Sequence, residues 1–292
     1  MLAQQLVNGV MQGAVYALFA LGFTLMFGVL RVINLTYGFY VSAGAFVALA
    51  LTERAELGIW TALPLAALAT GIMAVALDWL LLTRLRRAHA PELASLMVTL
   101  GAVLALYGAL SAWLGTDIRR LPARLEGQGF VVLGLHVSVA QVAILVVTAA
   151  LVAALVTLLR ATRLGLAIRA MAEQPEAAAL MGIDTARLAA LVSFISGTLA
   201  GAAGVLIGFA FNAIQPYMGE AMMLRGFVVV IAGGLGDVGG AVIAGLALGV
   251  IEALTAAYFA SAMKEAVGFV VLVLVLWTRP AGLFGRTAAR RA

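Results

Sequence analysis

The stretch LAALVSFISGTLAGAAGVLIGFAF, residues 188–211, carries no charged residue. Because a helix needs roughly 20 mostly apolar residues to cross a membrane, this stretch predicts a transmembrane helix. Its glycines recur at spacings of four, three and four residues and form one stripe on that helix: Gly197, Gly201, Gly204 and Gly208. The same device recurs in two pairs: Gly9 with Gly13, and Gly245 with Gly249. Such glycines let helix backbones approach closely, so we expect them to pack helices together rather than to contact a solute.

The whole chain has the composition of a membrane protein. Hydrophobic residues make up 64% of it and charged residues 11%, against ~45–50% and ~25% in a soluble domain. Charges, prolines and glycine-rich turns divide the sequence into nine apolar segments: 8–30, 39–52, 60–82, 93–114, 138–159, 188–211, 222–234, 240–257 and 263–278. We predict an all-α, polytopic helical membrane protein with about eight to nine spans, forming a single transmembrane domain over residues 1–292. Segments 39–52 and 222–234 are too short to cross as simple helices, which indicates short broken or re-entrant segments.

Several kinds of chemistry are excluded or disfavoured by what the sequence lacks. Without cysteine the chain has no disulfide or thiol chemistry. Its two histidines, His89 and His136, have no second ligand at a useful spacing, so we expect no metal and no cofactor. Basic residues cluster at span ends, where membrane lipid explains the net charge of +5 better than nucleic acid does. The first residues lack a basic n-region, so we expect no removable signal peptide.

The basic residues also predict an orientation. If the first span runs inward and later spans alternate, twelve of the eighteen Lys and Arg residues fall on the inner side and six on the outer side. This asymmetry favours an outside N-terminus and a cytoplasmic C-terminus, with a cytoplasmic segment at about 160–187. The loop 115–137 would then face outward, either as a short strand pair or as an amphipathic cover.

The charged segment IRAMAEQPEAAALMGIDTARL, residues 168–188, separates two long apolar runs. Pro175 suits the first position of a short helix that would end at Met181. Gly182 suits a left-handed stop after that helix, and Asp184 suits the N-cap of the following span. A helix of about 10 Å is too short to be stable alone, so it needs a partner surface. That surface is either the protein's own inner face or a separate soluble protein.

The run AGGLGDVGGAV, residues 232–242, predicts a break or a tight turn, because each glycine costs a helix ~1 kcal/mol relative to alanine. A nucleotide site is not favoured there, since no Lys-Ser/Thr follows the glycines. Interrupted elements in the two halves of a membrane protein indicate a solute pathway, here near segments 39–52 and 222–234. The candidate pathway residues are Asn34, Tyr37, Asn212, Gln215, Tyr217, Gly233 and Gly234. For the tyrosines, a place in the aromatic belts at the membrane interfaces is an equally open alternative.

Three stretches carry a resemblance to the branched-chain amino acid ABC transporter permeases. The coupling region of that family is similar to RLGLAIRAMAEQPEAAALMGIDTARLAALVSFISGTLAGAAGVLIG, in its Arg-Ala, its small-residue helix, its Met-Gly-Ile and the arginine four residues later. The opening of the family resembles NGVMQGAVYALFALGFTLMFGVLRVINLTYG. Its later half resembles QPYMGEAMMLRGFVVVIAGGLGDVGGAVIAGLALGVIEA. The resemblance therefore covers nearly the whole chain.

This resemblance implies a membrane subunit of an importer in the bacterial cytoplasmic (inner) membrane. The implied partners are two cytoplasmic ATP-binding subunits, a second permease subunit, homologous or identical, and an extracytoplasmic solute-binding protein. By the same resemblance the short charged helix docks in a groove of the ATPase, through the coupling residues Arg169, Glu173, Glu176, Met181 and Gly182. The chain has no GxxxxGK[ST] motif, so we expect a transport subunit without an ATPase site, not an enzyme.

The solute is indicated less sharply than the family. Where the family commonly has Ala-His-Gly-Glu after Ile-Asn-Phe, this chain reads INLTYGF, residues 33–39. Branched-chain or related small amino acids are the leading interpretation, and urea, short amides or other small carboxylates are the alternative. A self-powered secondary transporter is an alternative from another class; it would need acids deep in the membrane, for which Asp78, Asp237 and Glu252 are the candidates. For Glu252, a place close to the outer interface or pairing with a neighbour is the preferred interpretation.

Overall fold

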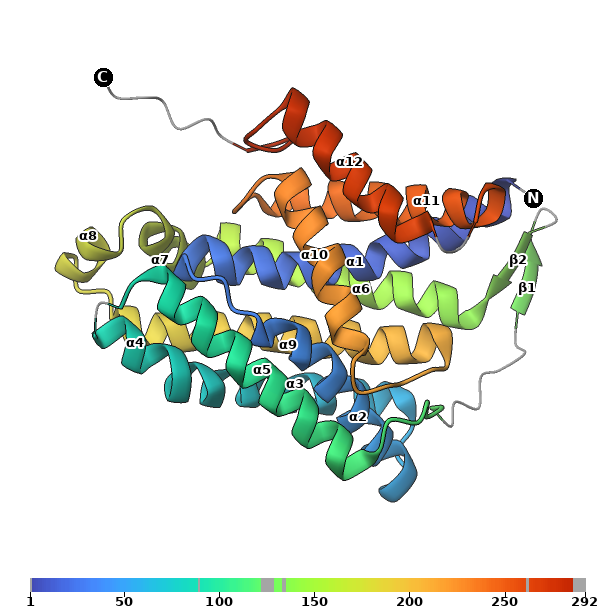
Figure 1. Cartoon of the computed structure of the whole chain (residues 1–292), viewed down its shortest axis with the longest axis horizontal. Helices are drawn as coiled ribbons and strands as arrows, with labels where there is room; N and C mark the ends of the chain where they lie inside the picture. Colours follow the sequence, from blue (N-terminus) through green and yellow to red (C-terminus); the bar gives the residue numbers. More distant parts are fainter. Residues whose placement is uncertain (1, 89, 122–128, 133–134, 261–262, 286–292) are drawn as a thin grey trace.

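The computed structural model describes residues 2–88, 90–121, 129–132, 135–260 and 263–285. Its elements are α1 (Leu2–Leu30), α2 (Thr36–Arg54), α3 (Ile59–Leu77), the π-helical turn η1 (Asp78–Leu82), α4 (Thr83–Arg87), α5 (Glu92–Leu114), β1 (Gly129–Val132), β2 (Leu135–Ser138), α6 (Val139–Ala161), α7 (Arg163–Glu173), α8 (Pro175–Leu180), α9 (Thr185–Phe211), α10 (Met218–Gly233), α11 (Val238–Tyr258) and α12 (Lys264–Thr278). Figure 1 shows α1, α6, α9 and α11 running along the longest axis of the molecule. Helix α8 lies at one end of this bundle and the β1–β2 hairpin at the other, so we call these the α8 end and the hairpin end.

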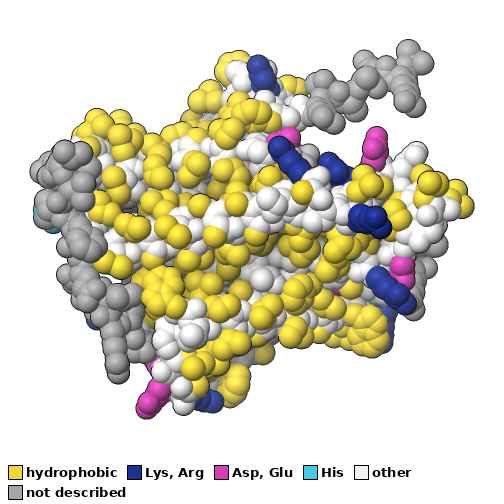
Figure 2. All heavy atoms as spheres, turned by 180° about the vertical axis from the view of Figure 1, so that it is seen from behind, with side chains coloured by type: hydrophobic (Ala, Val, Ile, Leu, Met, Phe, Trp, Pro, Cys, Tyr) yellow, Lys and Arg dark blue, Asp and Glu magenta, His cyan; other side chains and the backbone are white. Residues whose placement is uncertain are grey.

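The all-α membrane architecture predicted from the sequence is confirmed for the described residues, apart from the small hairpin. Six described helices are long and apolar enough to cross a membrane: α1, α3 with its continuation to Arg86, α5, α6, α9 and α11. Each of the nine predicted apolar segments overlaps a helix. In Figure 2 the middle of the visible face is hydrophobic, and most of the charged side chains seen there lie toward the α8 end, on the right. The exact number of spans stays a prediction.

Helices α1 and α11 touch along their backbones at the two glycine pairs that the sequence singled out. A Cβ atom added at Gly9 would lie 2.7 Å from the Cα atom of Val250, and one added at Gly13 would lie 2.7 Å from the Cα atom of Leu246. An added Cβ atom at Gly249 would clash with the backbone of Gly13. No side chain larger than hydrogen fits at these contacts, so the predicted helix-packing role of the glycines is confirmed.

The glycine stripe of α9 has the same role toward α2 and α3. A Cβ atom added at Gly44 of α2 would lie 2.6 Å from the Cα atom of Gly201. On the neighbouring side of the stripe, Gly197 faces Ala74 and Gly71 of α3. Helix α9 is therefore held closely between α2 and α3, and the predicted packing role of its glycine stripe is confirmed.

The two segments predicted as short or interrupted form unbroken helices. Helix α2 has 19 residues and starts earlier than the predicted segment, whereas α10 has 16 residues and covers only ~24 Å. The irregular backbone precedes α2, where residues 31–35 turn back from the end of α1 (Figure 1). There the side-chain oxygen of Asn34 accepts hydrogen bonds from the backbone nitrogen (3.0 Å) and the hydroxyl (2.6 Å) of Thr36. Asn34 and Thr36 are both buried, so these bonds satisfy polar groups that their apolar surroundings could not satisfy.

The loop over residues 115–137 contains the strand pair that was one of its two predicted forms. Strands β1 and β2 pair in antiparallel fashion, with Gly129 opposite Ser138. Ser138 then caps α6 in a capping box with Gln141. Residues 122–128 of the loop lie outside the described part of the chain.

We expect Gly249→Val to destabilise the bundle, because the new side chain meets the backbone of Gly13 and α11 must move away from α1. Overpacking of this kind costs about 1–3 kcal/mol or more. The thermal midpoint of the purified protein in detergent measures the loss. The matched control is Gly101→Val on α5, where an added Cβ atom meets nothing within 4 Å. Equal midpoints for the two variants would contradict the importance of the α1–α11 contact.

Candidate functional site

The charged segment between α6 and α9 forms two short helices, as predicted. Thr162 caps α7, because its hydroxyl accepts a hydrogen bond from the backbone nitrogen of Gly165 at 3.0 Å. Pro175 begins α8, where its missing N–H group leaves no intrahelical bond unmade. Helix α8 ends at Leu180, one residue before the predicted end at Met181.

The turn after α8 also contains the predicted left-handed glycine and the predicted N-cap of α9. Gly182 has φ +85°, a left-handed conformation that favours glycine. Asp184 accepts hydrogen bonds from the backbone nitrogens of Ala186 (3.1 Å) and Arg187 (3.0 Å) and so caps α9. Adjacent residues decide these caps, which is why the sequence was sufficient to predict them.

The tip of α8 presents large apolar side chains to its surroundings. Leu180 is 89% exposed and Met181 is 84% exposed, whereas Ala178 of the same helix is buried. A groove of about 730 Å³ runs between α7 and α8 beside this tip. Apolar side chains clustered at a polar end of the bundle, outside its lipid-facing band, suit contact with another protein.

One arginine joins this segment to α1. Nη2 of Arg31 donates hydrogen bonds to the carbonyl oxygens of Ala172 (2.9 Å) and Glu173 (3.0 Å), the last residues of α7. Arg31 directly follows α1 and has φ +51°, which is uncommon for a residue with a side chain. Carbonyl groups at a helix C-terminus lack intrahelical partners, and the helix dipole favours a cation there. The C-terminal ends of α1 and α7 are thereby tied together.

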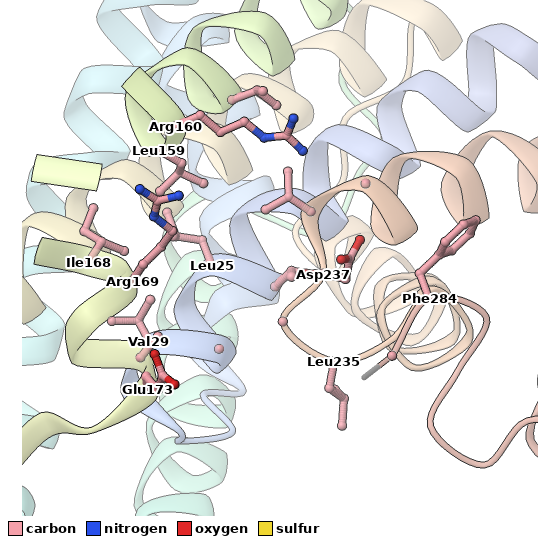
Figure 3. Close-up of a pocket in the computed structure, with 18 residues that line it drawn as sticks. Leu25, Val29, Leu159, Arg160, Ile168, Arg169, Glu173, Leu235, Asp237 and Phe284 are labelled. Atoms are coloured by element: carbon pink, nitrogen blue, oxygen red, sulfur yellow. The ribbon is translucent and has the colours of Figure 1, made fainter. Parts of the chain in front are cut away.

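A cavity of about 670 Å³ opens between α7 and the ends of α1, α6 and α11. Figure 3 shows the side chains of Arg160 and Arg169 on one side of it and Asp237 on another side. Of the residues predicted for ATPase coupling, Arg169 and Glu173 line this cavity. The others are exposed: Glu176 lies in the first turn of α8, and Met181 and Gly182 follow the end of that helix. The structure thus divides the predicted coupling residues into two groups, and their contact with a partner remains a proposal.

The break predicted in residues 232–242 is confirmed, and the chain that follows α12 forms hydrogen bonds with it. Helix α10 ends at Gly233, and Gly234 has φ +107°. The backbone nitrogens of Leu283 and Phe284 donate hydrogen bonds to the carbonyl oxygens of Ala232 (2.8 Å) and Gly233 (3.2 Å). These bonds satisfy carbonyl groups that the end of α10 leaves free. The two glycines therefore have a structural role, and their contact with a solute remains a proposal.

The other predicted pathway residues lie in separate places. Tyr37, in α2, is fully buried and its hydroxyl donates to the carbonyl oxygen of Phe19 at 3.0 Å, so it does not lie in an interfacial aromatic belt. Asn34 supports the turn before α2, and Asn212 ends α9 with φ +45°. Two further predicted pathway residues, Tyr217 and Gln215, lie at the hairpin end. The ring of Tyr217 is tilted against that of Tyr107, with ring centroids 5.4 Å apart. Gln215 lines a pocket of about 260 Å³.

The acids considered for ion coupling all have partners. Asp78 forms an ion pair with Arg86 at 2.6 Å, and Glu252 forms one with Arg225 at 3.3 Å. Asp237 caps α11. Of the two forms of the preferred interpretation of Glu252, the structure shows the pairing with a neighbour. Within the described ranges no group of three or more acidic or histidine side chains gathers as a metal site would require.

The sequence matches the family model described as branched-chain amino acid transport system, permease component, over residues 5–276. The chain belongs to this family. Its members are permease components of transport systems that work with other subunits, so the chain is a multi-pass permease subunit and not an enzyme. This agrees with the family that the sequence resembled.

Similar proteins support the assignment along almost the whole chain. The high-affinity branched-chain amino acid permease LivH of Salmonella typhimurium is 34% identical over 97% of this chain and 95% of its own length. BraD of Pseudomonas aeruginosa is 33% identical with the same coverage. The probable permease LivH of Methanocaldococcus jannaschii is 30% identical over 92% of this chain and 88% of its own. Among solved structures, PsaBC from Streptococcus pneumoniae in complex with a Fab has a TM-score of 0.51 and 11% identity, covering 97% of this chain and 93% of that one, which shows likeness of fold alone.

We expect Arg31→Gln to loosen the end of α7, because both carbonyl hydrogen bonds lose their charged donor. A loss of ~1.5 kcal/mol or more would speed local opening roughly tenfold. Hydrogen exchange of the backbone amides from Glu173 to Met181, followed by mass spectrometry, measures this. Arg163→Gln, an exposed arginine at the start of α7, is the control. Unchanged exchange in Arg31→Gln would show that α7 is held to the bundle without Arg31.

Proposed function

We propose that this permease subunit serves a bacterial ABC importer that moves branched-chain or related small amino acids across the cytoplasmic membrane. Its single transmembrane domain would span residues 1–292, with the coupling segment at about 160–187. The named function of LivH and BraD supports the solute class. The observation that carries the coupling role is the exposed apolar tip of α8, formed by Leu180 and Met181.

The proposed partners supply the energy and the solute. Two cytoplasmic ATP-binding subunits would drive transport, a second permease subunit, homologous or identical, would complete the membrane part, and an extracytoplasmic solute-binding protein would deliver the solute. Support comes from the asymmetry of Lys and Arg, which favours an N-terminus outside and an α8 end in the cytoplasm. In this orientation the tip of α8 meets the ATP-binding subunit and the hairpin end meets the binding protein.

The proposed coupling route runs from the tip of α8 into α1. An ATPase that holds Met181 would carry α8 and the adjoining α7 as it moves. Arg31 joins the C-terminal end of α7 to that of α1, so the movement would reach α1 directly. Arg169 and Glu173 would change their position in the cavity of Figure 3 during the same movement. Rigid-body motion of a short packed helix is a common way of transmitting such a change.

Two further parts of the proposal concern the solute. Asn34, Tyr37, Asn212, Gln215, Tyr217, Gly233 and Gly234 remain the proposed pathway residues, and Gln215 has the best support because it lines a pocket. Urea, short amides or other small carboxylates are the alternative solutes. The partners found for Asp78, Asp237 and Glu252 disfavour a self-powered transporter, since each acid is already engaged.

The orientation is tested by single cysteines, because the chain contains none of its own. We expect Met181→Cys, at the tip of α8, to be labelled by a membrane-impermeant maleimide only from the cytoplasmic side. Ala55→Cys, after α2 at the opposite end, should be labelled only from outside. Labelling in intact cells and in inside-out vesicles measures both. The opposite pattern would reverse the orientation and exclude the ATPase contact at α8.

The coupling role is tested by replacing the apolar tip. We expect Leu180→Ser with Met181→Ser to leave the thermal midpoint of the permease unchanged, because both side chains are exposed. Loss of a central apolar contact costs an interface ~2 kcal/mol or more, so ATP-driven leucine uptake by the reconstituted complex should fall at least about tenfold. Leu180→Met with Met181→Leu, which keeps both exposed side chains apolar, is the control. Full uptake by the double variant would place the coupling in another part of the chain.

A further inference from the structure

The pocket at the hairpin end combines an apolar wall with a polar side. It has a volume of about 260 Å³ and lies between α1, α9, α10 and the start of α12. Ile207, Phe211, Met218 and Met222 contribute apolar surface. Ligand sites for small molecules are concave and mostly apolar, with a few placed polar groups that fix orientation. This pocket has that form and a size suited to a small amino acid.

One cation of the polar side is fixed by its neighbours. The side chain of Arg225 is only 16% exposed and pairs with Glu252 at 3.3 Å and with Glu265 at 3.0 Å. Its guanidinium carbon lies 5.7 Å from the ring centroid of Tyr16, whose hydroxyl donates to Glu252 at 2.8 Å. Four helices therefore hold this group: α1, α10, α11 and α12. A network of this kind keeps one wall of the pocket in place.

The second cation is available to a ligand. Lys264 lines the pocket at the start of α12 and is the only lysine in the sequence. Within the described part of the chain the ammonium group of Lys264 makes no ion pair or hydrogen bond, whereas the guanidinium group of Arg225 pairs with Glu252 and Glu265. The two cations, Arg225 and Lys264, balance the two carboxylates, Glu252 and Glu265, so the cluster as a whole is neutral. Because Arg225 is paired with both carboxylates, the charge that remains available to a ligand is the positive one of Lys264. Such a site favours a ligand that presents a carboxylate and has no net charge.

We infer that this pocket binds the transported amino acid as a zwitterion, with Lys264 holding its α-carboxylate. This inference rests on the proposed function. It adds where the solute binds and how the pocket distinguishes an amino acid from other solutes. The branched side chain of the ligand lies against Phe211 and the two methionines of the pocket. Its ammonium group donates hydrogen bonds to the amide oxygens of Gln12 and Gln215. Urea and short amides have neither a carboxylate nor an apolar side chain, so the pocket selects against them.

The test is equilibrium binding of radiolabelled L-leucine to the purified complex of the permease and its partner subunits in nanodiscs, without the binding protein. We expect Lys264→Gln to raise the Kd for leucine about tenfold or more, because a charged hydrogen bond is lost. Lys264→Arg should retain most of the binding. Arg54→Gln, an exposed cation at the same end but outside the pocket, should bind like the unmodified complex.

Competition identifies the group that is recognised. 4-Methylpentanoate, which keeps the carboxylate and the branched chain but lacks the ammonium group, should displace leucine only at higher concentrations than unlabelled leucine does, whereas leucinol and urea should not displace it. Unchanged leucine binding by Lys264→Gln, displacement by urea, or no binding to the unmodified complex would each overturn the inference. ATP-driven leucine uptake with the binding protein present is measured in parallel. Uptake by the unmodified complex together with normal leucine binding by Lys264→Gln would refute the role of the pocket and leave the proposed function standing. Absence of uptake by the unmodified complex would refute the proposed function itself.

Discussion

The backbone contact between α1 and α11 is the constraint on which most of the structure depends. Inside a membrane, apolar helices gain nothing by leaving lipid for one another, so close van der Waals contact has to hold them together. Gly13 and Gly249 permit that contact because neither carries a side chain. Once α1 is fixed at the centre, the pocket at the hairpin end and the cavity at the α8 end both include residues of this one helix.

Between these two spaces α1 carries a closed aromatic cluster. Tyr16 lines the pocket and Thr24 is the nearest residue of α1 that lines the cavity, and eight residues of helix separate them by about 12 Å. Phe19 and Phe23 lie between, with their rings against Tyr37 at 4.8 and 5.4 Å between centroids. A solute in the proposed pocket would thus be separated from the α8 end by packed side chains. A movement of α1 or α2 is needed to open this barrier, and Arg31 places α1 in contact with the segment that would deliver such a movement.

The charged groups are arranged so that the membrane part contains little unpaired charge. Glu252, only 2% exposed, would be costly in an apolar interior on its own, and the cation of Arg225 offsets this cost. Asp78 and Arg86 make the same arrangement near the π-helical turn η1. Arg160 and Arg169 form no ion pair with the residues that the structure describes, and they lie instead in a cavity at the α8 end, where water can reach them.

The sequence by itself determined the features that depend on neighbouring residues or on helical period. Pro175, Gly182 and Asp184 define α8 and its turn through local caps, and the glycine spacings identify the faces that pack, because a helix places residues three and four apart on one side. Only the tertiary structure decided which groups meet across the chain. Arg31 reaches α7 from 141 residues away, and Arg225 reaches Glu265 from another helix. The predicted pathway residues lie apart, some at either end of the bundle and Tyr37 between them. The physical reason is that an apolar helix surface specifies that it will be buried, but the partner it finds depends on how all the helices fit together at once.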